Sequence, residues 1–289
     1  MSKNPISSKV LKPGRQSVVM KTYRLVAASL LAALAIALQL TNEFIGIKTG
    51  FGMTVDLVAV PILLAFFIFG FKTALDVVIV LTLAIALTAS TGYIGAIMKF
   101  AATLPMIAIP ALYAISLKGK IGWQRAVAII LLGTLALTAL FALLAYPTAN
   151  LATVLGQSNV WGVYLVGLLP VVLIALTAYF LRWFVQGKET VELFSKPHHV
   201  IAVLALALAV RGIAMVIANL YFAGPLFFKI PPHEFIAFIE SQNILFFGKG
   251  TAWYAAIFFW NAVQGIIEFA IAWIIAFKLG FAGKYAPAE

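Results

Sequence analysis

FFWNAVQGIIEFAIAW, residues 258–273, places three polar groups in an otherwise apolar run extending from residue 252 to 280. Asn261, Gln264 and Glu268 stand at positions i, i+3 and i+7, so at about 3.6 residues per turn they project from one face of a helix. Amides and carboxylates are costly to expose to hydrocarbon. We therefore expect a membrane helix whose polar face turns toward other helices or a wet interior.

The composition places the whole chain in a membrane. Of its 289 residues, 64% are apolar and 10% charged, and the mean hydropathy is +1.08, whereas a soluble domain is about half apolar and a quarter charged. The net charge is +11, but the basic residues stand at the ends of apolar runs, as membrane topology requires. We therefore expect no nucleic-acid partner. With no cysteine and three histidines, neither a metal site nor a cofactor is expected.

Apolar runs long enough to cross a bilayer recur along the chain. A spanning helix needs about 20 apolar residues, and about eight such runs predict an all-α, polytopic helix bundle in the cell membrane. The runs cover residues 24–44, 55–71, 73–91, 94–117, 125–146, 160–184, 199–223 and 252–279. The second and third runs are separated only by Gly70-Phe71-Lys72, which predicts a tight helical hairpin.

The chain divides into one membrane domain between two polar tails. Residues 1–20 form a basic tail, 21–280 the transmembrane domain and 281–289 the second tail. Outside the spans, most Lys and Arg residues fall on the side of the N-terminus, which predicts cytoplasmic N- and C-termini. The basic residues that fall on the outer side are Lys48, Lys229 and Lys249.

Several polar side chains fall in the outer half of the predicted spans, where they form a cluster open to the outside. They are Asp56, Lys99, Asn219, Asn261 and Gln264. Aromatic residues border this cluster, namely Phe51, Tyr93, Tyr221, Trp253, Tyr254 and Trp260. Flat rings stack on aromatic faces while a few fixed amides read ring edges, so the pattern fits a flat heteroaromatic ligand. An interfacial belt is the alternative interpretation of the aromatics.

Two ionisable residues, Arg211 and Glu268, fall near mid-membrane on spans that one outer loop joins. Charged groups at that depth are paired or functional by default. We interpret them as a structural ion pair, with a proton or substrate relay as the alternative. Asp76 lies close to the inner end of its span, within reach of water.

The long outer loop, residues 224–251, contains an amphipathic segment from His233 to Phe247. A short helix on the outer surface is predicted there. Its apolar positions are Phe235, Ile236, Phe238 and Ile239. The helix is either a lid over the site or a plain interfacial helix.

The order of short motifs along the chain resembles the substrate-binding S component of energy-coupling-factor (ECF) vitamin transporters, most closely the riboflavin-specific group. The similarity covers the first four spans well and the last two moderately. The motifs are Val55-Asp56-Leu57 with Pro61, Phe69-Gly70, Thr91-Gly92 and Gly95 before Lys99-Phe100, Leu104-Pro105, Asn219-Leu-Tyr221 with Pro225, and Asn261-Ala-Val-Gln264.

The resemblance implies a core of six helices that binds a vitamin, here riboflavin or a relative, from the outer face. Residues 125–187 are then an inserted helical hairpin, unless the core is spans one to six with two helices appended. Asn219 and Asn261 match ligand-bonding positions. Gln264 stands where the family tends to have lysine, and Lys99 stands where asparagine is usual, so the vitamin's identity stays open. Tyr221 and Asp56 complete the implied site.

Energy would come from partners, a transmembrane coupling subunit and a pair of ATPases, since this chain has no GxxxxGK[ST] loop. Small residues four apart allow close helix approach. In the first span, the resemblance makes Ala28, Ala32 and Ala33 the surface that docks on the coupling subunit.

Two other classes of function fit some of these residues. A self-sufficient, proton-coupled secondary transporter would use Asp76, Arg211 and Glu268 as a proton path and would need no partner. A membrane-embedded enzyme would need paired acids or a nucleophile beside a base. Asp56 and Asp76 lie on different helices at opposite depths, so we expect no enzyme and assign no catalytic residue.

Overall fold

The computed structural model of the chain describes residues 13–117, 168, 171, 172, 175, 176, 179, 193–242, 250 and 252–285. The predicted spans 125–146 and 160–184, and with them the segment 125–187 taken as an inserted hairpin, lie wholly or mostly outside the described residues. So do residues 1–12 and 286–289 of the two tails.

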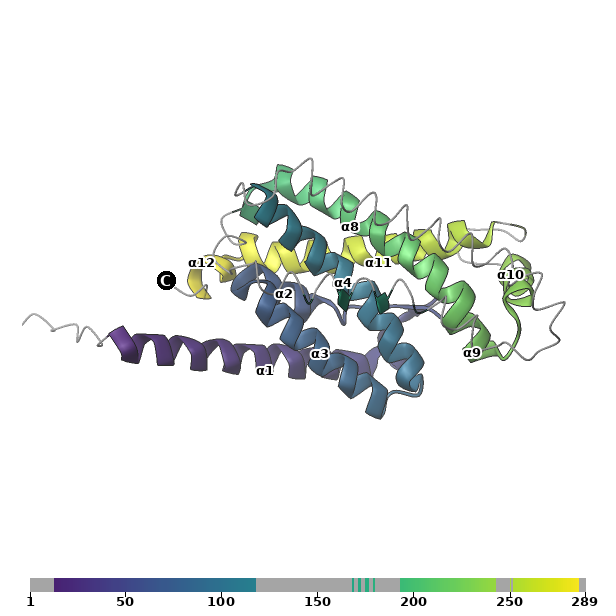
Figure 1. Cartoon of the computed structure of the whole chain (residues 1–289), viewed down its shortest axis with the longest axis horizontal. Helices are drawn as coiled ribbons and strands as arrows, with labels where there is room; N and C mark the ends of the chain where they lie inside the picture. Colours follow the sequence, from purple (N-terminus) through teal and green to yellow (C-terminus); the bar gives the residue numbers. More distant parts are fainter. Residues whose placement is uncertain are drawn as a thin grey trace, which may run out of the picture.

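The described residues form a helical bundle with one small β-hairpin (Figure 1). Its long helices are α1 (Pro13–Ile45), α3 (Phe71–Thr88), α4 (Gly92–Leu117), α8 (Pro197–Ala218) and α11 (Trp253–Trp273). The shorter elements are β1 (Ile47–Lys48), β2 (Thr54–Val55), α2 (Val60–Phe69), α9 (Gly224–Phe228), α10 (Pro232–Ser241) and α12 (Phe281–Tyr285), and π-helical turns η1 (Asn219–Ala223) and η2 (Ile274–Lys278) extend α8 and α11.

Five stretches of the described residues are long and apolar enough to cross a membrane: Lys21–Asn42, Phe71–Thr88, Gly92–Leu117, Pro197–Phe228 and Trp253–Lys278. They correspond to five of the predicted spans, so the prediction of an all-α membrane bundle is confirmed at this level. The helix α2 corresponds to a sixth predicted span, but it is too short to be counted among these five stretches.

The second predicted span, 55–71, differs from the prediction because its helix has only 10 residues, Val60–Phe69. At about 1.5 Å per residue this helix is about 15 Å long, half the thickness of a bilayer core. The chain before it forms the antiparallel hairpin of β1 and β2, which pairs Ile47 with Val55. After it, Gly70 at φ 88° separates α2 from α3, as the predicted tight hairpin requires.

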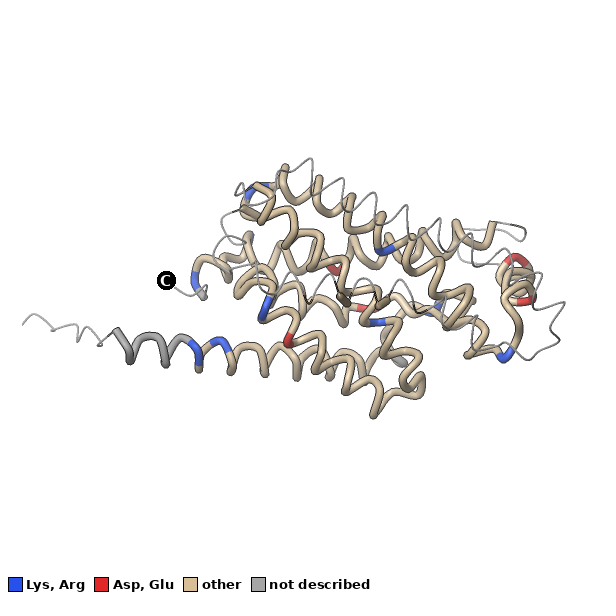
Figure 2. The backbone as a smooth tube through the Cα atoms, in the orientation of Figure 1, with Lys and Arg blue, Asp and Glu red and all other residues tan. Residues whose placement is uncertain are grey.

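The bundle has two distinct ends. The start of α1 and α12 lie at one end and α9 and α10 at the other (Figure 1), and we call these the termini end and the hairpin end. The β-hairpin reaches α9, because a Cβ on Gly52 would lie 3.6 Å from the Phe228 ring. Figure 2 shows Lys and Arg gathered at the termini end and charges of both signs in the middle of the bundle. Exposed basic residues at the termini end are Lys21, Arg24, Lys72, Lys196, Lys278 and Lys284.

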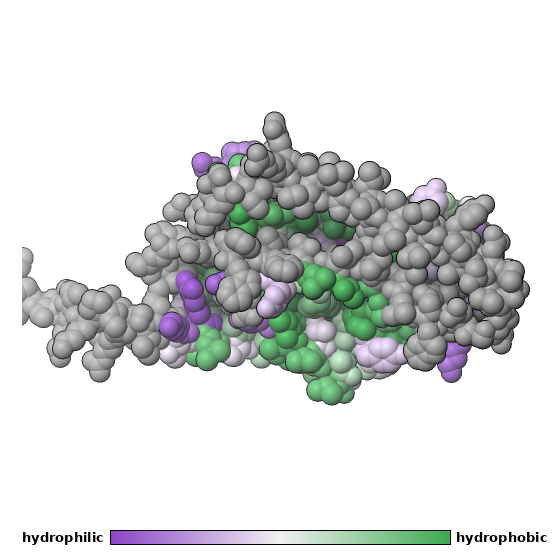
Figure 3. Space-filling model, in the orientation of Figure 1, coloured by the Kyte–Doolittle hydropathy of each residue, from purple (hydrophilic) through white to green (hydrophobic). Residues whose placement is uncertain are grey.

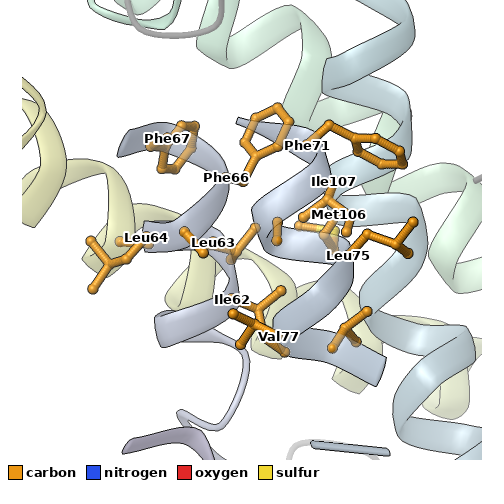
Figure 4. Close-up of a cluster of buried hydrophobic side chains, with 14 of the residues drawn as sticks. Ile62, Leu63, Leu64, Phe66, Phe67, Phe71, Leu75, Val77, Met106 and Ile107 are labelled. Atoms are coloured by element: carbon orange, nitrogen blue, oxygen red, sulfur yellow. The ribbon is translucent and has the colours of Figure 1, made fainter. Parts of the chain in front are cut away.

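A large apolar cluster fills the bundle around α2, and Figure 4 shows its centre. Every residue of α2 is buried. A helix without a polar face is stable there because other parts of the bundle surround it. Phe67 makes edge contacts with Phe269 and Phe277 at ring-centroid distances of 5.1 and 5.5 Å. We call this the termini-side cluster, and its largest members are Phe66, Phe67, Phe71, Phe194 and Phe269.

A second apolar cluster lies at the hairpin end. It joins α4, α8, α10, α11 and the β-hairpin, and its members include Phe51, Ala101, Met215, Phe235, Ile239 and Trp260. The predicted surface helix is present as α10, but Phe235 and Ile239 are buried in this hairpin-side cluster. The helix therefore packs on the bundle; whether it acts as a lid stays a prediction.

The outward faces of α1 and α3 carry exposed apolar side chains, including Leu25, Leu30, Leu83 and Leu87. Figure 3 shows apolar side chains along the described part of one face, as a lipid-facing surface requires. Of the three alanines expected to dock a partner, Ala32 is buried in the termini-side cluster, Ala28 packs against it, and Ala33 is exposed. Only Ala33 therefore stands free on the outer face.

Candidate functional site

The site begins where the extended chain of the β-hairpin becomes helix α2. The carboxylate of Asp56 accepts a hydrogen bond from the Val58 N–H at 3.0 Å, the local turn that aspartate favours. Pro61 then stands in the first helical turn, where its missing N–H costs nothing. The N–H of Ala59 donates to Oε1 of Glu268 at 3.3 Å. The N-terminus of α2 is therefore directed at a carboxylate inside the bundle, which the helix dipole favours.

Asp56 is held by three side chains from three long helices. Lys99 of α4 lies 2.5 Å from Oδ1 and Gln264 of α11 donates to the same oxygen at 3.1 Å. Asn42 of α1 donates to Oδ2 at 2.9 Å. Asp56, which lies between β2 and α2, thus links α1, α4 and α11 through its carboxylate.

Glu268 is a second carboxylate, and Gln264 bonds it as well as Asp56. Arg211 of α8 contacts Oε2 at 3.0 Å, and Gln264 donates to Oε1 at 3.1 Å. The ammonium of Lys99 lies 3.8 Å from Oε1. Arg211 and Glu268 are almost fully buried, at 2% and 0% exposure, so the two residues predicted to pair do so in the interior.

These contacts join two features that the sequence places separately, the outer polar cluster and the mid-membrane ion pair. Gln264 donates one N–H to each carboxylate and connects them. We call the connected group the polar network, and it consists of Asn42, Asp56, Lys99, Arg211, Gln264 and Glu268. Its two cations and two carboxylates balance in formal charge, which lowers the cost of placing them in a low-dielectric interior.

Two buried atoms of the network have no hydrogen-bond partner, Nε of Arg211 and Oδ1 of Asn42. Buried polar groups are nearly always satisfied by protein or water. These two atoms therefore mark where the network can take up an additional polar group.

The predicted asparagines lie on two helices, Asn261 three residues before Gln264 on α11 and Asn219 at the C-terminal end of α8. Asn261 is buried, and its Nδ2 donates to the Ile257 carbonyl at 2.9 Å and contacts Sδ of Met53 at 3.5 Å. Asn219 begins the π-turn η1 and donates to the carbonyl of Met215 at 2.8 Å. Such π-turns are frequent at functional sites. Among the described residues neither asparagine is hydrogen-bonded to a member of the network, so both lie outside it.

The aromatic residues separate into two groups. Phe51 and Trp260 are buried in the hairpin-side cluster, and Tyr221 and Trp253 pack against it. Tyr93 and Tyr254 are exposed and fit the alternative of an interfacial belt. Fewer aromatic residues therefore border the site than the sequence predicts.

Sequence reasoning missed Asn42 and the backbone of Ala59. Asn42 is a polar residue at the end of the first apolar run, a signal that was present but shared with its neighbours Thr41 and Glu43. Asp76, a member of the predicted proton path, is exposed on α3 and is not part of the network.

Within the described ranges, no group of three or more His, Asp or Glu residues could hold a metal ion. Comparison of the chain with protein-family models, with curated proteins and with solved structures finds no match.

Proposed function

We propose that the chain is the membrane-embedded binding subunit of a vitamin-uptake system, with riboflavin or a related flat heteroaromatic as its ligand. The observation that carries the proposal is the convergence of Asp56, Lys99 and Gln264, from three parts of the chain, in one partly buried polar group beside Asn261. Ionisable groups gathered inside a membrane bundle mark a functional site by default. Apolar walls with a few fixed polar groups are typical of small-molecule sites.

The hairpin-side cluster supplies the apolar walls. Met53 of the hairpin contacts Asn261 on the polar face of α11, and Phe51 of the hairpin is buried in the same cluster. A ligand that bonds Asn261 from the hairpin end would displace this hairpin. The two-residue strands of the hairpin give it few hydrogen bonds to lose, which favours such a motion.

The energy for uptake would come from a coupling subunit and its two ATPases, with the termini end in the cytoplasm. Two observations support this arrangement. Exposed lysines and arginines gather at the termini end (Figure 2), as the positive-inside rule favours. Ala33 on α1 is exposed and leaves room for close approach of another helix.

The test begins with the absorbance and mass spectra of any small molecule that co-purifies with the protein in detergent. Riboflavin is then titrated while tryptophan fluorescence is recorded, since Trp253 and Trp260 lie in or against the hairpin-side cluster. Stoichiometric quenching supports the proposal. A colourless protein that binds neither flavins nor any other vitamin would overturn it.

A proton-coupled secondary transporter is the second candidate, and one observation favours it. The ammonium of Lys99 lies 2.5 Å from Asp56 and 3.8 Å from Glu268, so one titratable group is close to both carboxylates, as a proton relay requires. The two candidates separate in vesicles that contain this chain alone. Uptake driven by a pH gradient supports the transporter, and binding without uptake supports the binding subunit.

A further inference from the structure

The side-chain amides of the site use their N–H groups on the protein itself. Gln264 donates both N–H groups, one to Asp56 and one to Glu268. Asn261 directs its Nδ2 at the Ile257 carbonyl and at Met53, and Asn42 directs its Nδ2 at Asp56. The N–H groups of all three amides are therefore used within the protein. Those of Asn42 and Gln264 hold Asp56, and that of Asn261 bonds its own helix and Met53 of the hairpin.

The orientation of these amides follows from their partners. A carboxylate and a carbonyl accept hydrogen bonds and cannot donate, so the nitrogen of each amide must face them and the oxygen must face away. In the described part of the chain, no hydrogen bond ends on Oε1 of Gln264 or on Oδ1 of Asn261, and Oδ1 of Asn42 is buried without a partner. The site is thus left with amide oxygens, which are acceptors.

Among the described residues, Nε of Arg211 is a buried donor without a hydrogen-bond partner. Arg211 lies close to Gln264, because a Cβ on the adjacent Gly265 would be 3.5 Å from Nη1 of Arg211. The site therefore offers the amide oxygens as acceptors and Nε of Arg211 as a donor. The chemical edge that complements them is an N–H flanked by a carbonyl, as in an imide or a lactam.

We propose that the ligand is recognised through an imide or lactam N–H that donates to Oε1 of Gln264, so that Gln264 is the residue that determines specificity. This rests on the proposed binding function and defines its ligand class. A lysine at position 264 could only donate and would select a ligand acceptor, whereas glutamine with both N–H groups engaged selects a ligand donor. Ligands lacking the N–H would leave that oxygen unpaired, and such mismatches are strongly discriminated.

Three flavins test the inference on the unmodified protein: riboflavin, 3-methylriboflavin, which lacks the imide N–H, and 5-deazariboflavin, which lacks a ring acceptor but keeps the imide. Equilibrium binding is measured by tryptophan quenching. We expect the 3-methyl compound to bind about tenfold or more weakly than riboflavin and the 5-deaza compound to bind within about threefold of it.

A variant cycle assigns the effect to one residue. In Gln264→Met, which removes the acceptor with little change in volume, the penalty for 3-methylation should fall to about twofold or less. A merely structural role of Gln264 would weaken both flavins equally and leave the penalty unchanged, which would overturn the assignment to Gln264.

The outcomes separate this inference from the proposed function. Equal binding of riboflavin and 3-methylriboflavin, or a large loss with 5-deazariboflavin, overturns the inference while the binding function stands. No binding of any of the three flavins overturns both the flavin function and the inference. The comparison of the three flavins needs no variant, so it does not depend on whether Gln264→Met folds.

Discussion

The two apolar clusters of the bundle differ in the side chains that build them. The termini-side cluster is built from phenylalanine rings in edge contact, such as Phe67 with Phe269, and α2 within it is buried on every side. The hairpin-side cluster mixes rings such as Phe235 and Trp260 with Ala101 and Met215, and Met53, packed against it, contacts Asn261. In the function that we propose, the first half anchors the bundle and the second contains the groups that contact the ligand. The difference predicts that stability and binding can be changed separately.

Glu268→Ala should have the largest effect, because it removes the partner of a buried guanidinium. Breaking a buried ion pair costs about 3–5 kcal/mol, so we expect strong destabilisation of the detergent-solubilised protein in thermal unfolding, together with loss of ligand binding. The matched control is the double variant Arg211→Met with Glu268→Met. It should recover most of the stability but not the binding, and recovery of both would place the network outside the site.

Phe67→Ala should come next and should act on stability alone. Truncating a buried phenylalanine costs about 3–5 kcal/mol, and Phe67 has 0% exposure. Thermal unfolding should shift strongly, while the dissociation constant measured at low temperature stays within about twofold. A tenfold loss of affinity in folded Phe67→Ala protein would show that the two halves are not separable.

Gly70→Ala should have an intermediate effect. The glycine separates α2 from α3 at φ 88° and ψ −178°, a backbone region that only glycine adopts readily, at a cost of about 1–3 kcal/mol for another residue. The shift in thermal unfolding should fall between those of Phe67→Ala and a surface substitution. A neutral outcome would mean that the turn can be rebuilt without the positive φ.

Ala33→Leu should have the smallest effect on the isolated chain. Ala33 is exposed whereas Ala32 is buried, so Ala32→Leu should cost about 1–3 kcal/mol by overpacking and Ala33→Leu about 0.5 kcal/mol or less. If Ala33 lies in the partner interface, Ala33→Leu should still reduce co-purification with a coupling subunit. Normal co-purification would remove this part of α1 from the interface.

The sequence was sufficient for the long helices because apolar length alone defines them, as in residues 94–117 and α4. It also predicted the buried face of Asn261, Gln264 and Glu268, which a period of 3.6 residues determines. It was wrong about residues 55–59, because an apolar run does not reveal that Asp56 terminates an extended segment inside the bundle. The link between Asp56 and Glu268 depends on tertiary packing of α11 against α2, which no local pattern encodes.

Asn261→Ala is the sharpest test of our proposal that the ligand binds at the hairpin end of the bundle. Asn261 contacts Met53 of the hairpin, is uncharged and lies outside the polar network. Its truncation should therefore leave the fold intact. We expect riboflavin affinity, measured by equilibrium dialysis with wild type and variant side by side, to fall about tenfold or more, or about 1.4 kcal/mol. Unchanged affinity in a folded variant would contradict the account.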